Sequence, residues 1–164
     1  MAPRPPADAV VALRSLARRY RGLFAGLEDD ESPDDLAHRH GLDGRSALDH
    51  VVAATRTLVF LRRATEQALV DDDPVLHPAV LDAAQREWPD ATGTVEDALG
   101  ELEREAGAFA DRVAHVPAAD WSRPARVASH DQTTTPLATL WDAVDTAIAH
   151  LKQADATLQK VRRT

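Results

Sequence analysis

The chain has 164 residues, an apolar fraction of 44%, a formal net charge of −8 at pH 7 and no cysteine. This length suffices for one domain with a substantial core. The lack of cysteine excludes disulfides, thiolate nucleophiles and cysteine-ligated zinc. The acidic balance argues against sequence-independent binding to nucleic acid or to an anionic membrane, because both require a basic surface.

Residues 1–6 are rich in proline and are predicted to form a disordered lead-in to a single domain over residues 7–164. The opening MAPRPPADA lacks the apolar core of a signal peptide. No apolar run approaches the roughly 20 residues that span a bilayer. We therefore expect a cytoplasmic protein.

The first helix is predicted from about Ala7 to Leu27. Its apolar residues keep a spacing of three and four: Val10, Leu13, Ala17, Tyr20, Phe24 and Leu27. The acidic run EDDESPDD that follows is expected to end the helix in a loop. A short turn is expected over residues 36–40.

The second helix is predicted to begin after Asp43 or Ser46 as N-cap and to continue to about Val70. Its main face comprises Leu48, Val51, Val52, Thr55, Leu58 and Val59. Further apolar residues leave only a narrow polar strip, so this helix should be the most buried. Arg62 and Glu66 interrupt the stripe, and this end should either leave the core or bring both charges to partners.

The helical pattern stops between Asp71 and Gly93. Within this segment Pro78 is predicted to start a short helix over residues 78–87. About 23 residues is long for a hairpin between antiparallel helices. The connection is therefore expected to cross the length of a bundle and to leave the second and third helices parallel.

Two further helices are predicted, from Thr94 to about His115 and from Thr135 to Val161. The first has a heptad of Val95, Leu99, Leu102, Ala106, Phe109, Val113 and Val116, with a capping box of Thr94 and Asp97. The second has Thr135 as N-cap, Pro136 at its first position, and a stripe of Leu137, Trp141, Val144, Ile148, Leu151 and Leu158. The sequence thus predicts an all-α four-helix bundle.

The chain lacks the motifs of a P-loop, a dinucleotide-binding turn, an esterase elbow and a zincin. Of its histidines, His50 and His150 lie within helices predicted to be largely buried. Imidazoles that project from facing helices into a bundle are the usual ligands of a metal site. Hydrogen bonds from each histidine to a carbonyl, or to Asp49 or Asp145, would explain both without metal.

The second and fourth predicted helices resemble those of the DinB superfamily, which includes DinB/YfiT-like metalloenzymes and mycothiol-dependent maleylpyruvate isomerases. The resemblance is carried by DGRSALDHVVAAT, where Asp43 precedes His50 by seven residues, by TAIAHLKQ, and by PAADWSRPA before the last helix. It covers nearly the whole chain in helix order. It implies a four-helix bundle with one metal ligand from the second helix and two from an HxxxH motif on the fourth.

The first residue of the implied HxxxH motif is Thr146 rather than histidine or glutamate. A neutral hydroxyl is a poor ligand for a divalent ion. The candidate metal site consists of His50 and His150 as ligands, with Thr146 at the position where the family has its third ligand. The side chains that could support it or substitute for a ligand are Asp49, Asp145 and Gln153.

Three functions are compatible with this pattern. One is a metal- and thiol-dependent transferase or isomerase resembling maleylpyruvate isomerase, with zinc, nickel or iron at the site. The interpretation slightly preferred is a DinB-like bundle whose metal site has degenerated, retained to bind a small-molecule or thiol ligand or to form a homodimer. The third is a purely structural bundle, favoured if the two imidazoles lie more than about 10 Å apart, beyond any shared ion.

Overall fold

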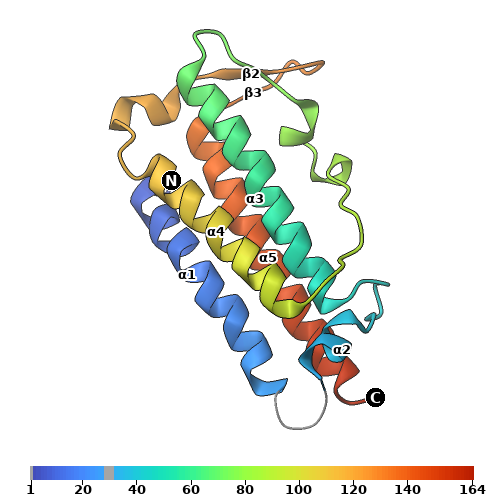
Figure 1. Cartoon of the computed structure of the whole chain (residues 1–164). Coiled ribbons are helices and arrows are strands. Elements are labelled where there is room, and N and C mark those ends of the chain that lie inside the picture. The colour runs from blue at the N-terminus through green and yellow to red at the C-terminus, as the bar shows by residue number, and fades with distance from the viewer. Residues whose placement is uncertain (1, 28–31) are drawn as a thin grey trace.

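Four long helices form the bundle that the apolar periodicity predicts (Figure 1). They are α1 (Pro6–Phe24), α3 (Ala47–Val70), α4 (Val95–Val113) and α5 (Pro136–Val161). The computed structural model describes residues 2–27 and 32–164. The first four residues of the acidic run lie outside this range, and its last residues begin the short helix α2 (Pro33–His38). The predicted turn over residues 36–40 is therefore the end of a helix rather than a separate element.

Hydroxyl N-caps fix the starts of three of the long helices. Ser46 caps α3, since its hydroxyl accepts a hydrogen bond from the Asp49 N–H at 3.0 Å while the Asp49 carboxylate accepts one from the Ser46 N–H at 2.8 Å. This reciprocal capping box selects Ser46 over Asp43 as the first boundary. Thr94 and Thr135 cap α4 and α5 through the N–H groups three residues on.

The direction of the helices sets the topology. Figure 1 shows α3 and α4 running in one direction and α1 and α5 in the other. The segment from Asp71 to Thr94 returns along the bundle before α4 begins, as its length predicts. We refer to residues 71–94 as the connection.

The connection does not contain the predicted helix over residues 78–87. Pro78 starts the 3₁₀ helix η2 (Pro78–Val80), and a separate 3₁₀ helix, η3 (Ala83–Gln85), follows. Asp82 divides them, because its backbone is extended and its carboxylate accepts a hydrogen bond from the Ala84 N–H. Such local capping competes with a continuous helix.

A small sheet, which the sequence analysis did not predict, closes one end of the bundle. Its strands are β1 (Val75–Leu76), β2 (Ala125–Val127) and β3 (Thr133–Thr134), with β2 in the middle. β1 pairs parallel to β2, and β3 pairs antiparallel. A minor apolar cluster packs beneath it: Ala64, Ala68, Leu76, Val80, Ala125 and part of Phe60. The 3₁₀ helix η4 (Ala118–Ser122) precedes β2 and buries Trp121 in the main core.

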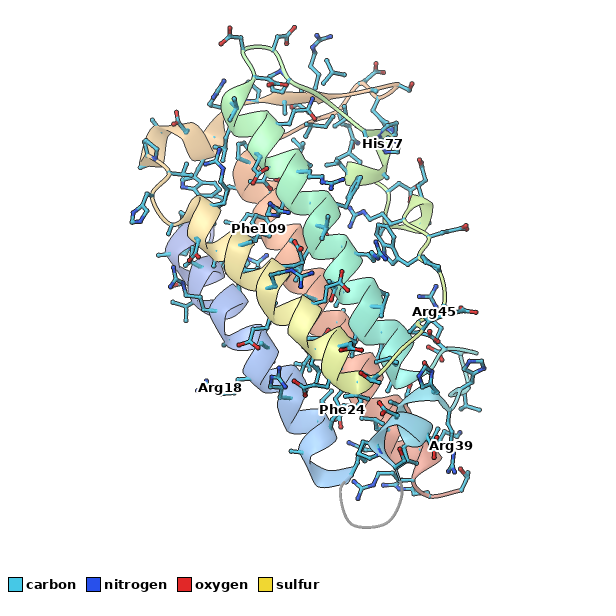
Figure 2. All side chains as sticks on the ribbon, viewed as in Figure 1. Arg18, Phe24, Arg39, Arg45, His77 and Phe109 are labelled. Carbon is cyan, nitrogen blue, oxygen red and sulfur yellow. The ribbon has the colours of Figure 1, made fainter. Side chains whose placement is uncertain are left out.

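The main core is centred on α3, of which 14 of 24 residues are buried, against 11 of 26 in α5. This confirms that α3 is the most buried helix. It packs most extensively against α5, while α1 packs mainly against α4. In Figure 2, Phe109 of α4 lies inside the bundle. Arg62 finds Glu105 of α4 at 3.3 Å, and Glu66 lies 3.7 Å from Arg112, so both predicted charges have partners.

The stripe predicted for α5 is shifted around the helix. Leu137, Trp141 and Ile148 are only half-buried. The fully buried line instead follows Leu140, Ala143, Val144, Ala147, Leu151 and Ala154. Small residues at the centre of this face let α5 approach α3 and α1 closely, so a stripe counted on large side chains misses them.

The segment before α1 contacts α5. Arg4, which precedes α1, makes two hydrogen bonds to the Asp145 carboxylate and lies 3.9 Å from the centroid of the Trp141 ring. Across the described ranges, no helix has the length and apolarity needed to cross a membrane.

Candidate functional site

A cavity of ≈ 320 Å³ lies between α3, α5 and the connection. Its lining residues are Asp43, Arg45, His50, Thr57, Ala83, Arg86, Trp88, Thr146, His150 and Gln153. Four of the six candidate residues named from the sequence are among them. The two candidate carboxylates, Asp49 and Asp145, are not.

The two histidines meet in this cavity. The His50 Nδ1 and His150 Nδ1 atoms are 3.2 Å apart, and the ring centroids are 5.5 Å apart with the planes tilted by 38°. His50 lies near the start of α3 and His150 in the second half of α5, and the antiparallel course of these helices brings them level. The separation is well inside the limit of about 10 Å that would have favoured a purely structural bundle.

The surroundings keep both imidazoles neutral. Burial lowers the pKa of His150 to about 4, with further lowering from His50 and Arg45 and an opposing hydrogen bond from Gln153. Burial also lowers the pKa of His50, although Asp43 acts in the opposite direction. At pH 7 one Nδ1 therefore donates to the other, and neutral imidazole is also the form that binds metal.

Asp43 lies behind His50. The His50 Nε2 atom is buried, is without a hydrogen-bond partner among the described residues, and lies 3.3 Å from the Asp43 Oδ2 atom. A carboxylate in this place favours a proton on Nε2, which leaves Nδ1 of His50 as the acceptor facing the cavity. The sequence identifies Asp43 as a possible N-cap and as part of the family resemblance. It does not predict the contact of Asp43 with His50, because this contact depends on the turn before α3.

Thr146 lines the cavity one turn before His150, but its hydroxyl is engaged. It donates to the Asp142 Oδ1 atom at 3.1 Å, while the Asp142 Oδ2 atom accepts from Arg86 Nη2 at 2.7 Å. Arg86 also donates to the backbone carbonyls of Ala79 and Val80. These bonds fasten the connection to α5. Arg86 and Trp88 could not be assigned to the cavity from the sequence, because no local pattern relates the connection to α3 and α5.

The carboxylates suggested as substitute ligands have other partners. Asp49 accepts hydrogen bonds from the N–H groups of Ser46 and Ala91. Burial alone would raise the pKa of Asp49, but the hydrogen bonds from Ala91 and Ser46 lower it overall. Asp49 thus caps α3 and anchors the end of the connection. Asp145 lies on the exposed side of α5, where it pairs with Arg4 at 2.6 Å.

The donor set fits two of the ligands of a divalent ion. Two imidazole nitrogens on one tetrahedral zinc ion lie about 3.3 Å apart, given Zn–N distances of about 2.0–2.1 Å. The Nδ1 atoms of His50 and His150 match this separation. No group of three or more histidine, cysteine or acidic side chains suited to a metal occurs in residues 2–27 and 32–164. The remaining positions would have to be filled by water or by a bound molecule.

Comparison with known proteins supports the fold. No family model matches the sequence, and no curated protein matches it. Among solved structures, the chain is similar to YfiT from Bacillus subtilis, described as a probable metal-dependent hydrolase with an unusual four-helix bundle topology. The TM-score is 0.72 at 12% sequence identity, over 99% of this chain and 92% of that one. The chain therefore has the four-helix bundle fold of YfiT, which is the fold that its sequence resemblance implies.

Proposed function

We propose that the protein is a metal-dependent enzyme acting on a small molecule, with a divalent ion held by His50 and His150 in the cavity between α3 and α5. The observation that carries this proposal is the 3.2 Å separation of the two Nδ1 atoms across a lined cavity. The likeness to YfiT, which is described as a probable metal-dependent hydrolase, supports the same class of chemistry. Zinc, nickel and iron all accept imidazole ligands.

The protein residues have separate tasks in this site. Asp43 favours the proton on His50 Nε2, which directs the lone pair of Nδ1 into the cavity. His150 would present its Nδ1 lone pair with its own proton on Nε2. The low pKa of His150 means that protons do not compete with an ion near neutral pH. A divalent ion with open positions supplies Lewis acidity and lowers the pKa of bound water.

A thiol-dependent transferase or isomerase uses the same cavity differently. In that case a thiolate ligand would occupy an open position, as the resemblance to the maleylpyruvate isomerase branch implies. Hydrolysis, the activity in the description of YfiT, is preferred over a thiol-dependent reaction. Water alone can complete a site with two protein ligands, while a thiol would have to be recognised by further side chains.

A ligand-binding module without catalysis is the second candidate. It is favoured by one specific observation, namely that Thr146 is hydrogen-bonded to Asp142 and supplies no third strong ligand. On this alternative the histidine pair is a neutral hydrogen-bonded contact between α3 and α5.

Metal titration distinguishes these candidates. Chelator-treated protein would be titrated by calorimetry with zinc, nickel and iron(II), comparing the parent with His50→Ala, His150→Ala and the exposed control His130→Ala. We expect one ion per chain in the parent and the control, and loss of binding in both cavity variants. Equal binding in all four proteins would place the metal elsewhere and refute the proposal.

A gain-of-ligand variant extends the test. Thr146→His restores the HxxxH spacing on the wall of the cavity and should tighten metal binding by roughly tenfold or more, since even outer-shell partners are worth about 10–100-fold. Ala149→His adds the same side chain at an exposed position one residue before His150 and should give no gain. Equal affinity in the parent and Thr146→His would show that the ion does not lie between α3 and α5 at this level.

A further inference from the structure

The cavity carries an excess of positive charge on a chain whose net charge is −8. Arg45 and Arg86 both line it, and Asp43 is the only acidic side chain among the described residues of the lining. Arg45 is exposed, makes no ion pair with a described residue, and lies outside the bundle on the side where the connection passes (Figure 2). Asp142, which does not line the cavity, neutralises part of the charge of Arg86 through an ion pair at 2.7 Å.

Arg86 is a buried cation with unused hydrogen-bonding capacity. Its side chain is 4% exposed, and its Nε and Nη2 atoms are held by Ala79, Val80 and Asp142. Its Nη1 atom is buried and has no hydrogen-bond partner among the described residues. A buried charged donor is costly to leave unpaired. Three hydrogen-bond partners thus fix the guanidinium, whose central carbon also lies 5.6 Å from the centroid of the Phe60 ring, and it retains a donor for which the described residues supply no acceptor.

The other lining side chains describe the rest of the ligand. Trp88 provides a half-buried aromatic surface, and Thr57, Thr146 and Gln153 provide uncharged polar groups. The volume of ≈ 320 Å³ is at the lower end of ligand pockets, which run from about 300 to 1,000 Å³. Asp142, the partner of Arg86, precedes His150 by two turns, or about 12 Å of helix rise. The cationic donor and the imidazole pair therefore lie at different levels along α5.

We propose that this cavity binds a small organic carboxylate, whose anionic group pairs with Arg86, whose body packs against Trp88, and whose entry Arg45 favours through longer-range attraction. The inference rests on the proposed function in that it takes the cavity to be the functional site, and it assigns the class of molecule that the site receives. The cavity would hold the anionic end of a carboxylate substrate at Arg86 of the connection, so that the other end of the substrate approaches His50 and His150.

Binding can be followed through the indole N–H signals of the three tryptophans in nuclear magnetic resonance spectra. Trp88 lines the cavity, while Trp121 lies in the core and Trp141 lies beside Arg4, so two signals act as internal controls. The Trp88 signal would be assigned with Trp88→Phe. Benzoate should shift this signal saturably and leave the other two in place, while the uncharged analogue benzamide should have little effect.

Substitutions test the assigned cations. Arg86→Gln should raise the dissociation constant of benzoate by about tenfold or more, as expected for a hydrogen bond to a charged group. Arg45→Gln, at an exposed position, should raise it by roughly twofold to fivefold. The matched control is Arg123→Gln, because Arg123 also donates to backbone carbonyls, those of Leu69 and Asp71, but does not line the cavity. This control should bind benzoate as the parent does.

Three results would overturn the inference: an unmoved Trp88 signal, an equal shift with benzamide, or benzoate affinities that are the same in Arg45→Gln, Arg86→Gln and the parent. Metal titration of the same proteins separates this failure from that of the proposed function. Histidine-dependent metal binding without a benzoate response would refute the carboxylate inference alone. An arginine-dependent benzoate response without metal binding would sustain it and refute the metal site.

Discussion

The surroundings of the His150 imidazole disfavour its protonated, positively charged form. It is half-buried, it faces His50, and Arg45 adds repulsion, whereas only Gln153 favours its protonated form. In the unfolded chain the same group titrates near its ordinary pKa of 6.5. Protonation therefore favours unfolding, and the histidine pair makes the folded state sensitive to acid.

We predict that this sensitivity is confined to the interval between the two pKa values. Because the folded pKa of about 4 lies below the unfolded value, the unfolded chain binds more protons between pH 6.5 and 4. The contribution of His150 to stability is complete above pH 6.5 and is lost as the pH falls toward 4. Urea unfolding of chelator-treated protein across this range should show a smaller decline in His150→Gln than in the parent.

An exposed histidine provides the comparison for this measurement. His130→Gln should retain the decline of the parent, because His130 is exposed and does not line the cavity. Parallel curves for the parent and His150→Gln would mean that His150 is hydrated in solution and that the histidine contact is not maintained.

The individual site residues differ in how far the sequence reveals them. His50 and His150 can be found because each is a polar residue within a strongly apolar helix. Asp43 and Arg86 cannot be assigned in this way, since their roles depend on a turn before α3 and on a contact across 56 residues to Asp142. Thr146 was identified as a departure from the family pattern, yet its hydrogen bond to Asp142 required the structure.

Helices with an unambiguous apolar face were predicted well. Six of the seven heptad positions named for α4 are buried, from Val95 to Val113, and only Val116 beyond the helix end is half-buried. The face of α5 was predicted less well because alanines occupy its centre. The strands and 3₁₀ helices were not predicted, since segments of two to five residues are too short to show a period.

Paired truncations on α4 and α5 test these faces. Leu102 is fully buried, so Leu102→Ala should lower the free energy of unfolding by about 2–5 kcal/mol. Ile148 is half-buried, and Ile148→Ala should cost roughly 1–2 kcal/mol, in proportion to the apolar surface that it removes from water. Urea unfolding followed by circular dichroism measures both. Equal losses would return Ile148 to the core and restore the stripe predicted from the sequence.

At the scale of the whole molecule, the connection is joined to the bundle by several independent contacts. Arg86 binds Asp142 of α5, Ala91 binds Asp49 of α3, and β1 pairs with β2. The length of the connection predicted that it would cross the bundle, but its contacts could not be read from sequence. The extent of a single domain over residues 7–164 remains a prediction.

Cooperative unfolding would test that domain assignment. If the connection and the bundle form one unit, the fluorescence of Trp88 and the circular dichroism of the helices should follow the same urea transition. The Trp88 signal can be isolated by comparing the parent with Trp88→Phe. An earlier change at Trp88 would identify the connection as a separate, less stable unit.

The connection also divides the cavity lining between two parts of the chain. The imidazole pair belongs to α3 and α5, whereas Arg86 and Trp88 belong to the connection, which contacts these helices through Asp142 and Asp49. Transplanting a different segment over residues 78–90 should therefore alter which molecules enter while retaining the histidines. The helices of the bundle thus hold the two histidines while a connecting segment supplies other side chains of the cavity lining, and this division suggests loop grafting as a way to diversify the cavity.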